Sequence, residues 1–161
     1  MKLLLDTNAL IDHVAQRQPY CRAIDELCVA SYFGDIELWV PVQSFLDALY
    51  SLRKMTDQRT LRNAFIGCLE FFHPCGSRAN DLLAALKSNW PDVEDYLIAC
   101  SATHVDADYL VTRDITGFAS SKVKTITPDE AIKMLREKGL TYELVAKFHH
   151  VLTMHKDHPL S

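Results

Sequence analysis

The sequence predicts one α/β domain in which a parallel sheet of about five strands lies between two layers of helices. Short apolar runs alternate along the chain with longer segments whose apolar residues recur every three or four positions, and these are the patterns of buried strands and amphipathic helices. Strands that alternate with helices form a parallel sheet covered on both faces. The 161 residues contain no Gly/Ser-rich linker, internal repeat or low-complexity tract, so residues 1–161 are expected to form a single domain.

In the first half of the chain, apolar periodicity predicts two strands and four helices. The first strand, 2–5, is an apolar run that ends at Asp6. The helical segment after it, 9–33, is divided into two helices by Pro19, because proline cannot sit inside a regular helix. The other predicted elements of this half are a strand at 36–40 and helices at 41–54 and 57–72.

The second half is predicted to hold three strands and four helices. Pro128 is suited to the first turn of a helix and Gly139 to its end, which delimits one of these helices. A short strand is expected within 73–77, and further strands at 109–112 and 123–126. The other helices are expected at 80–88, 92–105 and 141–155, the last as a C-terminal extension, 141–161, of the domain.

Composition predicts a cytoplasmic protein. No apolar run approaches the roughly 20 residues that cross a bilayer, and MKLLL leads directly into LDTN without a signal-peptide cleavage site. The five cysteines contain no C-x-x-C pair, so reduced structural thiols are expected rather than a zinc site or disulfides. The net charge of −4 argues against a protein that coats nucleic acid by charge alone. It does not exclude an enzyme that holds a phosphodiester through a divalent ion.

Four aspartates are predicted to meet at the carboxyl edge of the sheet, where open α/β sheets bind ligands. Asp6 and Asp114 follow predicted strands, and Asp47 and Asp95 lie near the starts of helices that rise from the same edge. Gathered carboxylates repel one another unless a cation intervenes, and Mg²⁺ or Mn²⁺ favours such oxygen ligands. Such an ion would activate water and neutralise charge on a phosphate, so the pattern favours phosphodiester hydrolysis.

Each aspartate also has a purely structural explanation. Asp6, Asp47 and Asp95 are placed to cap helices or complement their dipoles, and Asp114 suits a turn after a strand. Taken one at a time, these roles are the more common ones for aspartate. They do not require four carboxylates to share one edge of one sheet, however, so the joint pattern favours a functional site.

Four segments of the chain resemble the PIN-domain family, and in particular its VapC-like toxins of bacterial toxin–antitoxin pairs. The segments are LLLDTNALID, FLDALYSLRK, WPDVEDYLIACSA and DYLVTRDITGF, and the resemblance runs from about residue 2 to about residue 137. It implies a sheet of order 3-2-1-4-5, an acidic pocket that binds Mg²⁺ or Mn²⁺, and cleavage of single-stranded RNA. It further implies a homodimer and a cognate antitoxin as partners.

The resemblance also assigns roles to the four acids. Asp6 matches the first acid of the family and Asp95 the third, both as metal ligands, with Glu94 and Asp92 close to the second of these positions. Asp114 matches a position that relatives fill with Asp or Asn, and it too would bind metal. Asp47 falls where relatives carry Glu or Asn, and its match is the weakest of the four.

Polar neighbours of these acids are assigned in the same way. Thr112 matches a hydroxyl residue that supports the pocket, and Asn8 matches the polar neighbour of the first acid. Arg53, Lys54 and Arg113 are candidates for contact with RNA phosphates, because phosphate contacts supply much of the affinity for nucleic acids. A solvated helix face explains the basic pair at 53–54 equally well.

The chain departs from the family pattern at two places. Gly117 stands where many relatives carry an Asp, and residues 141–161 extend past the usual end of the domain. This extension contains four of the seven histidines, His149, His150, His155 and His158. A metal site there would need the histidines to be held by partners, so a solvated surface is the favoured interpretation.

The leading hypothesis is therefore a Mg²⁺- or Mn²⁺-dependent endoribonuclease that acts on single-stranded RNA as the toxin of a toxin–antitoxin pair. The alternative hypothesis is a PIN-fold protein that binds RNA or a protein partner without cutting. The filled acidic positions favour the enzyme. The weak match at Asp47 and the glycine at 117 keep the alternative open.

Overall fold

The computed structural model describes residues 1–142 and contains five strands and seven helices in that part of the chain. Strands and helices alternate as the apolar pattern predicts. The strands are β1 (Lys2–Leu5), β2 (Glu37–Pro41), β3 (Phe72–Cys75), β4 (Tyr109–Val111) and β5 (Thr125–Ile126). The helices are α1 (Thr7–Val14), α2 (Cys21–Tyr32), α3 (Val42–Leu52), α4 (Gln58–Cys68), α5 (Ala79–Lys87), α6 (Val93–His104) and α7 (Pro128–Glu137).

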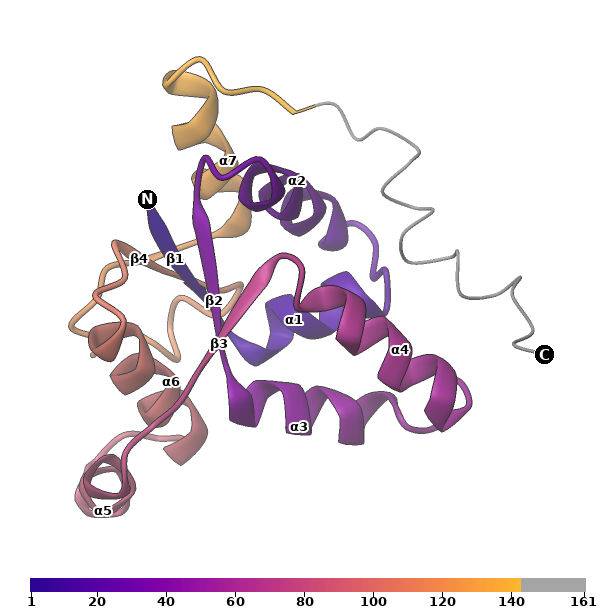
Figure 1. The fold of residues 1–161 in the computed structure, drawn as a ribbon. Coiled ribbons are helices and arrows are strands. Elements are labelled where there is room, and N and C mark those ends of the chain that lie inside the picture. Colours follow the sequence, from indigo (N-terminus) through magenta and orange to yellow (C-terminus); the bar gives the residue numbers. More distant parts are fainter. Residues whose placement is uncertain (143–161) are drawn as a thin grey trace.

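The five strands form one parallel sheet in the order β3-β2-β1-β4-β5 (Figure 1), as expected. β1 lies at the centre, where Leu4 pairs with Trp39 of β2 and with Leu110 of β4. The chain adds β2 and β3 on one side of β1 and then crosses to add β4 and β5 on the other. The order therefore reverses between β1 and β4, and ligands of open α/β sheets bind beyond the carboxyl ends of the strands at such a reversal.

Helices cover both faces of the sheet, which explains why β1 is apolar throughout. Successive side chains of a strand point to opposite faces. Leu3 and Leu5 therefore join the larger core with α1, α2, α3, α4 and α7, whereas Leu4 joins a smaller core with Leu110 and residues of α6. Figure 1 shows α5 and α6 on one side of the sheet and α1 and α2 on the other.

Local capping sets where several elements begin. α1 starts at Thr7, two residues earlier than apolar periodicity predicts, because the Asp6 carboxylate accepts a hydrogen bond from the Ala9 amide and caps the helix. α7 begins with Pro128 after a reciprocal Thr127–Glu130 capping box. The predicted strands 73–77 and 123–126 are realised as Phe72–Cys75 and Thr125–Ile126, and such shifts of a few residues are usual for element ends.

The predicted helix 141–155 lies outside the described residues, apart from its first two positions. Tyr142, the last described residue, donates a hydrogen bond from its hydroxyl to Asp35 at 2.6 Å. All five cysteines are free thiols, as expected. Among residues 1–142, no helix has the length and apolar character that a membrane span requires.

Replacement of a central core residue should destabilise the fold strongly. Leu4 is fully buried in the central strand, so Leu4→Ala should lower the free energy of unfolding by about 2–5 kcal/mol through lost burial and a residual cavity. Met55→Ala, at an exposed position after α3, should change it by less than about 0.5 kcal/mol. Urea unfolding followed by circular dichroism measures both values. Equal losses in the two variants would contradict the assigned core.

Candidate functional site

The carboxyl edge of the two central strands carries a group of acidic side chains. Asp6 directly follows β1, and Asp114 lies shortly after β4, which pairs with β1. Glu94 and Asp95 lie in the first turn of α6, which packs against both strands. We call Asp6, Glu94, Asp95 and Asp114 the acidic cluster.

Asp6 is held rigidly in a buried position. Its side chain is 2 % exposed, one carboxylate oxygen accepts a hydrogen bond from the Ala9 amide at 2.7 Å, and the other accepts one from the Thr112 hydroxyl at 2.6 Å. Burial raises the pKa of Asp6 from 3.8 to about 6, against the lowering effect of these two hydrogen bonds and of Arg113. The group is thus a carboxylate whose negative charge is poorly solvated.

Thr112 links Asp6 to Asp114. The Thr112 side chain is fully buried. Its hydroxyl oxygen accepts a hydrogen bond from the Asp114 amide at 2.9 Å, and the hydroxyl donates a hydrogen bond to the Asp6 carboxylate. One hydroxyl therefore sets both the orientation of the first acid and the path of the backbone at the last. These two contacts place Thr112 between Asp6 and Asp114, and its supporting role in a functional pocket stays a prediction.

Asp95 and Asp114 converge on the backbone of Gly117. A Cβ atom at this glycine would lie 2.7 Å from Asp114 Oδ2 and 3.0 Å from Asp95 Oδ2, so both carboxylates reach the same small space. Asp114 Oδ1 also accepts a hydrogen bond from the Gly117 amide at 2.9 Å. The departure from the family pattern at 117 thus has a physical reason here, because a side chain would collide with the acids.

The pKa of Asp95 is raised to about 6. Burial is the main cause, and the negative charges of Asp92, Asp114 and Glu94 add to it. Asp92 is the cap of α6, since its carboxylate accepts hydrogen bonds from the amides of Glu94 and Asp95. It is therefore a structural residue of α6, close enough to contribute charge to the cluster.

A hydroxyl pair joins the starts of α1, α3 and α6. Thr7 Oγ1 lies 2.7 Å from Glu94 Oε1 and 2.8 Å from Ser44 Oγ. Thr7 has one proton, and a carboxylate accepts only, so Thr7 donates to Glu94 and Ser44 donates to Thr7. Sequence reasoning did not single out Thr7 and Ser44; the signal available was a hydroxyl beside the first acid and another in the first turn of α3.

These contacts form a closed circuit around the acidic cluster. Asp6 connects through Thr112 to Asp114, and Asp114 meets Asp95 at Gly117. Glu94, adjacent to Asp95 in sequence, accepts a hydrogen bond from Thr7, and Thr7 directly follows Asp6 in the chain. Three of the four predicted acids are thereby brought together, along with Glu94.

Asp47 is the acid for which the structure records no such link. It lies on α3 with an exposed side chain, one turn beyond the fully buried Ser44. No hydrogen bond or ion pair joins Asp47 to the acidic cluster within residues 1–142. Its catalytic role stays a prediction.

The other predicted contact residues are spread over the surface. Asn8 is exposed in the first turn of α1. Arg53 and Lys54 follow the last residue of α3, about 16 Å along the helix from its start at the sheet edge, and the Arg53 guanidinium stacks on the Tyr50 ring at 3.5 Å. Arg113 lies next to Asp114, and its Nε is 2.8 Å from a carboxylate oxygen of the buried Asp12.

The donor set fits a hard divalent cation such as Mg²⁺ or Mn²⁺. No group of three or more metal-ligating side chains is close enough to enclose an ion in the described part of the chain. Mg²⁺ keeps several of its waters, however, and commonly uses only one or two carboxylates. Asp95 and Asp114 provide two converging carboxylates, the glycine between them leaves space, and their mutual repulsion is the kind that a cation relieves.

Comparison with known families decides the classification. A sequence model described as PIN domain matches residues 2–116. The chain belongs to the PIN-domain family. The match contains all four predicted acids, and residues beyond 116, including α7, extend past it. No curated protein sequence matches the chain.

Solved structures share the fold of this PIN domain. One is VapBC2 from Rickettsia felis bound to a promoter DNA fragment, with a TM-score of 0.57 and 16% identity over 79% of this chain and 98% of the other. VapBC-1 from nontypeable Haemophilus influenzae has a TM-score of 0.56 and 15% identity, over 80% of this chain and 99% of the other. FitAcB from Neisseria gonorrhoeae has a TM-score of 0.51 and 17% identity, over 78% of this chain and 97% of the other. Identities this low establish the shared architecture only.

Asp6 should make the stability of the metal-free protein depend on pH. Its pKa rises from 3.8 to about 6 on folding, so the folded state binds the proton more tightly than the unfolded state. Below about pH 4 both states are protonated and there is no penalty; between about pH 4 and pH 6 the unfolded state loses its proton first, and stability falls. At pH 7 the loss is on the order of 1–3 kcal/mol.

Asp6→Asn should remove this penalty. In EDTA, the variant should be more stable than the wild-type protein at pH 7 and of similar stability at pH 4, as measured by urea unfolding across that range. A variant that is less stable at pH 7 would show that the two hydrogen bonds of Asp6 outweigh the cost of its burial.

Proposed function

We propose that this PIN domain is a metal-dependent endoribonuclease that hydrolyses phosphodiester bonds of single-stranded RNA. The observation that supports it most directly is the circuit of contacts that gathers Asp6, Asp95 and Asp114 at the switch point of the sheet. Two of these acids have raised pKa values, and perturbed carboxylates are concentrated at functional sites. Helix capping alone would not require the carboxylates of Asp95 and Asp114 to lie together beside Gly117.

Asp95, Asp114 and Asp6 are the residues proposed to hold Mg²⁺ or Mn²⁺. Such an ion supplies an activated water at neutral pH and neutralises charge that develops on the phosphate oxygens. Thr112 fixes the orientation of the Asp6 carboxylate. Glu94 is bound by Thr7 through one oxygen and retains further lone pairs with which to orient a water molecule.

We further propose a cognate antitoxin and a homodimer as its partners. The structures named above are of VapBC and Fit assemblies, which supports the proposal that this chain is the toxin of a toxin–antitoxin pair. Self-association is supported by large apolar side chains that are exposed on α3 and α5, since exposed apolar patches mark interfaces. These side chains are Leu46, Tyr50, Leu82, Leu83 and Leu86.

A second candidate function is that of a binding module that no longer cuts. Two observations favour it: the exposed position of Asp47 and the absence of a three-ligand metal group among residues 1–142. The two candidates differ in whether cleavage depends on metal and on the acidic cluster.

Cleavage of RNA should require both metal and the acidic cluster. With Mn²⁺ or Mg²⁺, the purified protein should cut a fluorescently labelled single-stranded RNA, and EDTA should abolish the cutting. Asp95→Asn should lower the rate at least about a hundredfold, because it removes a carboxylate that is proposed to hold the catalytic ion. Glu70→Gln, at an exposed site just after α4, is the charge-matched control for catalysis. If wild type and Asp95→Asn behave alike on several RNAs, the binding-module candidate replaces the enzyme.

Metal binding should be sensitive to a single methyl group at Gly117. The Cβ of Gly117→Ala would press on the carboxylates of Asp114 and Asp95, so we expect the affinity for Mn²⁺ to fall at least about tenfold, or about 1.4 kcal/mol. Gly76→Ala is the matched control, because a Cβ there meets nothing within 4 Å. Calorimetric titration with Mn²⁺ measures both. Equal affinities in the two variants would place the ion elsewhere.

A further inference from the structure

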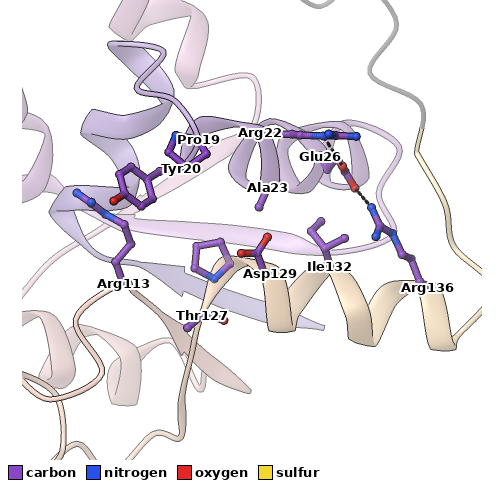
Figure 2. Close-up of a pocket in the computed structure, with 11 residues that line it drawn as sticks. Pro19, Tyr20, Arg22, Ala23, Glu26, Arg113, Thr127, Asp129, Ile132 and Arg136 are labelled. Carbon is purple, nitrogen blue, oxygen red and sulfur yellow. Dashed lines mark hydrogen bonds and ion pairs between the residues drawn. The ribbon is translucent and has the colours of Figure 1, made fainter.

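A groove of about 860 Å³ lies between α2 and α7, on the side of the sheet opposite to α5 and α6. Figure 2 shows Tyr20 and Arg113 at one end of this groove and Arg22, Glu26 and Arg136 at the other. Pro19, Ala23, Pro128 and Ile132 are the apolar residues of its lining. We call it the α2–α7 groove, and its lining includes Tyr20, Arg22, Arg113, Asp129, Ile132 and Arg136.

The α2–α7 groove begins next to the acidic cluster. Arg113, which lines its near end, is the residue between Thr112 and Asp114. The guanidinium is close enough to Asp6 for its charge to lower the pKa of that carboxyl. A strand that crosses the acidic cluster would therefore meet Arg113 as it leaves on this side.

Arg113 is held in place as part of a stacked pair. Its Nε lies 2.8 Å from a carboxylate oxygen of buried Asp12, and its guanidinium carbon lies 4.1 Å from the centre of the Tyr20 ring. The Tyr20 residue is 46 % exposed. An exposed aromatic ring with a fixed guanidinium is a platform on which nucleic-acid bases stack without regard to sequence.

The far end of the groove is positively charged. Glu26 is 5 % exposed and is bound by Arg136 at 2.9 Å and approached by Arg22 at 3.7 Å. Two arginines share one carboxylate, so the trio keeps a positive charge. The arginine side chains are 56% and 72% exposed, which leaves them accessible to phosphate. Among residues 1–142, Asp129 at the start of α7 is the one acid that lines the groove apart from Glu26.

We propose that the α2–α7 groove binds the single-stranded RNA that flanks the scissile phosphodiester, with a base on Tyr20 and the backbone along Arg22 and Arg136. This inference rests on the proposed function, since it takes the acidic cluster as the place of cleavage. A group of carboxylates repels the phosphates of a substrate. The groove supplies the positive charge and the aromatic ring that the acidic cluster lacks. It also differs from the basic pair Arg53 and Lys54, which lies at the distant end of α3.

The inference is tested by RNA affinity in the absence of cleavage. Fluorescence anisotropy with a labelled single-stranded RNA of about 12 nucleotides, a length within the range of sites that single-strand-binding folds occupy, is measured on the full chain in EDTA. Tyr20→Leu keeps apolar bulk but removes the ring, and it should weaken binding about tenfold. Arg22→Gln leaves the Arg136–Glu26 bond intact and should weaken binding several-fold, with the salt slope reduced by about 0.7.

Two further variants test whether RNA affinity depends on the charge of the groove and whether the dependence is confined to the groove. Asp129→Asn removes a negative charge from the groove and should tighten RNA binding about twofold to threefold. Lys87→Gln, at an exposed position on α5 on the other side of the sheet, should leave the affinity unchanged. Thermal unfolding confirms that each variant is folded.

The inference and the proposed function fail in different ways. If groove variants bind RNA as the wild type does, or if only Arg53→Gln and Lys54→Gln weaken binding, the groove assignment is overturned, whatever Asp95→Asn does to cleavage. If the groove variants change affinity as stated but no RNA is cut in Mn²⁺, the groove stands as an RNA site and the nuclease proposal falls. Opposite effects of Arg22→Gln and Asp129→Asn would support the groove in either case.

Discussion

The hydroxyl of Thr112 is the contact on which the arrangement of the acidic cluster depends. β1 and β4 are neighbours in the sheet, and Thr112, just past the end of β4, donates to Asp6 and accepts from the Asp114 amide. Fully buried, it has no water with which to exchange these bonds, and a buried donor or acceptor without a partner is costly. The backbone ladder brings the two strand ends together, and this side chain converts that proximity into a defined orientation of carboxylates.

The acidic cluster is held together against its own electrostatics. Asp6 and Asp95 both have raised pKa values, the first mainly through burial and the second through burial and three neighbouring acids. Arg113 compensates only in part, because the buried Asp12 also draws on its charge. The fold therefore maintains a concentration of negative charge that core packing must offset. Sites that bind cations or carry out acid–base chemistry commonly have this character, whereas helix caps are ordinarily solvated.

Much of the fold follows from patterns that are local in sequence. Periodicity within each segment located the strands and helices, because alternating burial is written into neighbouring residues. Element ends shifted where a side chain intervened, as when Asp6 capped α1 and started it at Thr7. The strand order followed only from the resemblance to PIN domains, since no local pattern states which strands pair. Asp6, Asp95 and Asp114 were identified as acids that follow strands or open a helix, and their positions at one edge agree with that reasoning.

The sequence by itself determined the α/β class and the acids available at the strand ends and helix starts. The tertiary structure decided which side chains meet. On α3, Ser44 contacts Thr7 whereas Asp47 is exposed. Residues three apart lie nearly one turn apart along the helix axis and do not point in the same direction, so only the packing around α3 decides which of them is covered. The tertiary structure also placed Tyr20 beside Arg113 and Glu26 beside Arg136. Such pairs join residues about a hundred positions apart, and only the packing of α2 against α7 and the sheet brings them into contact.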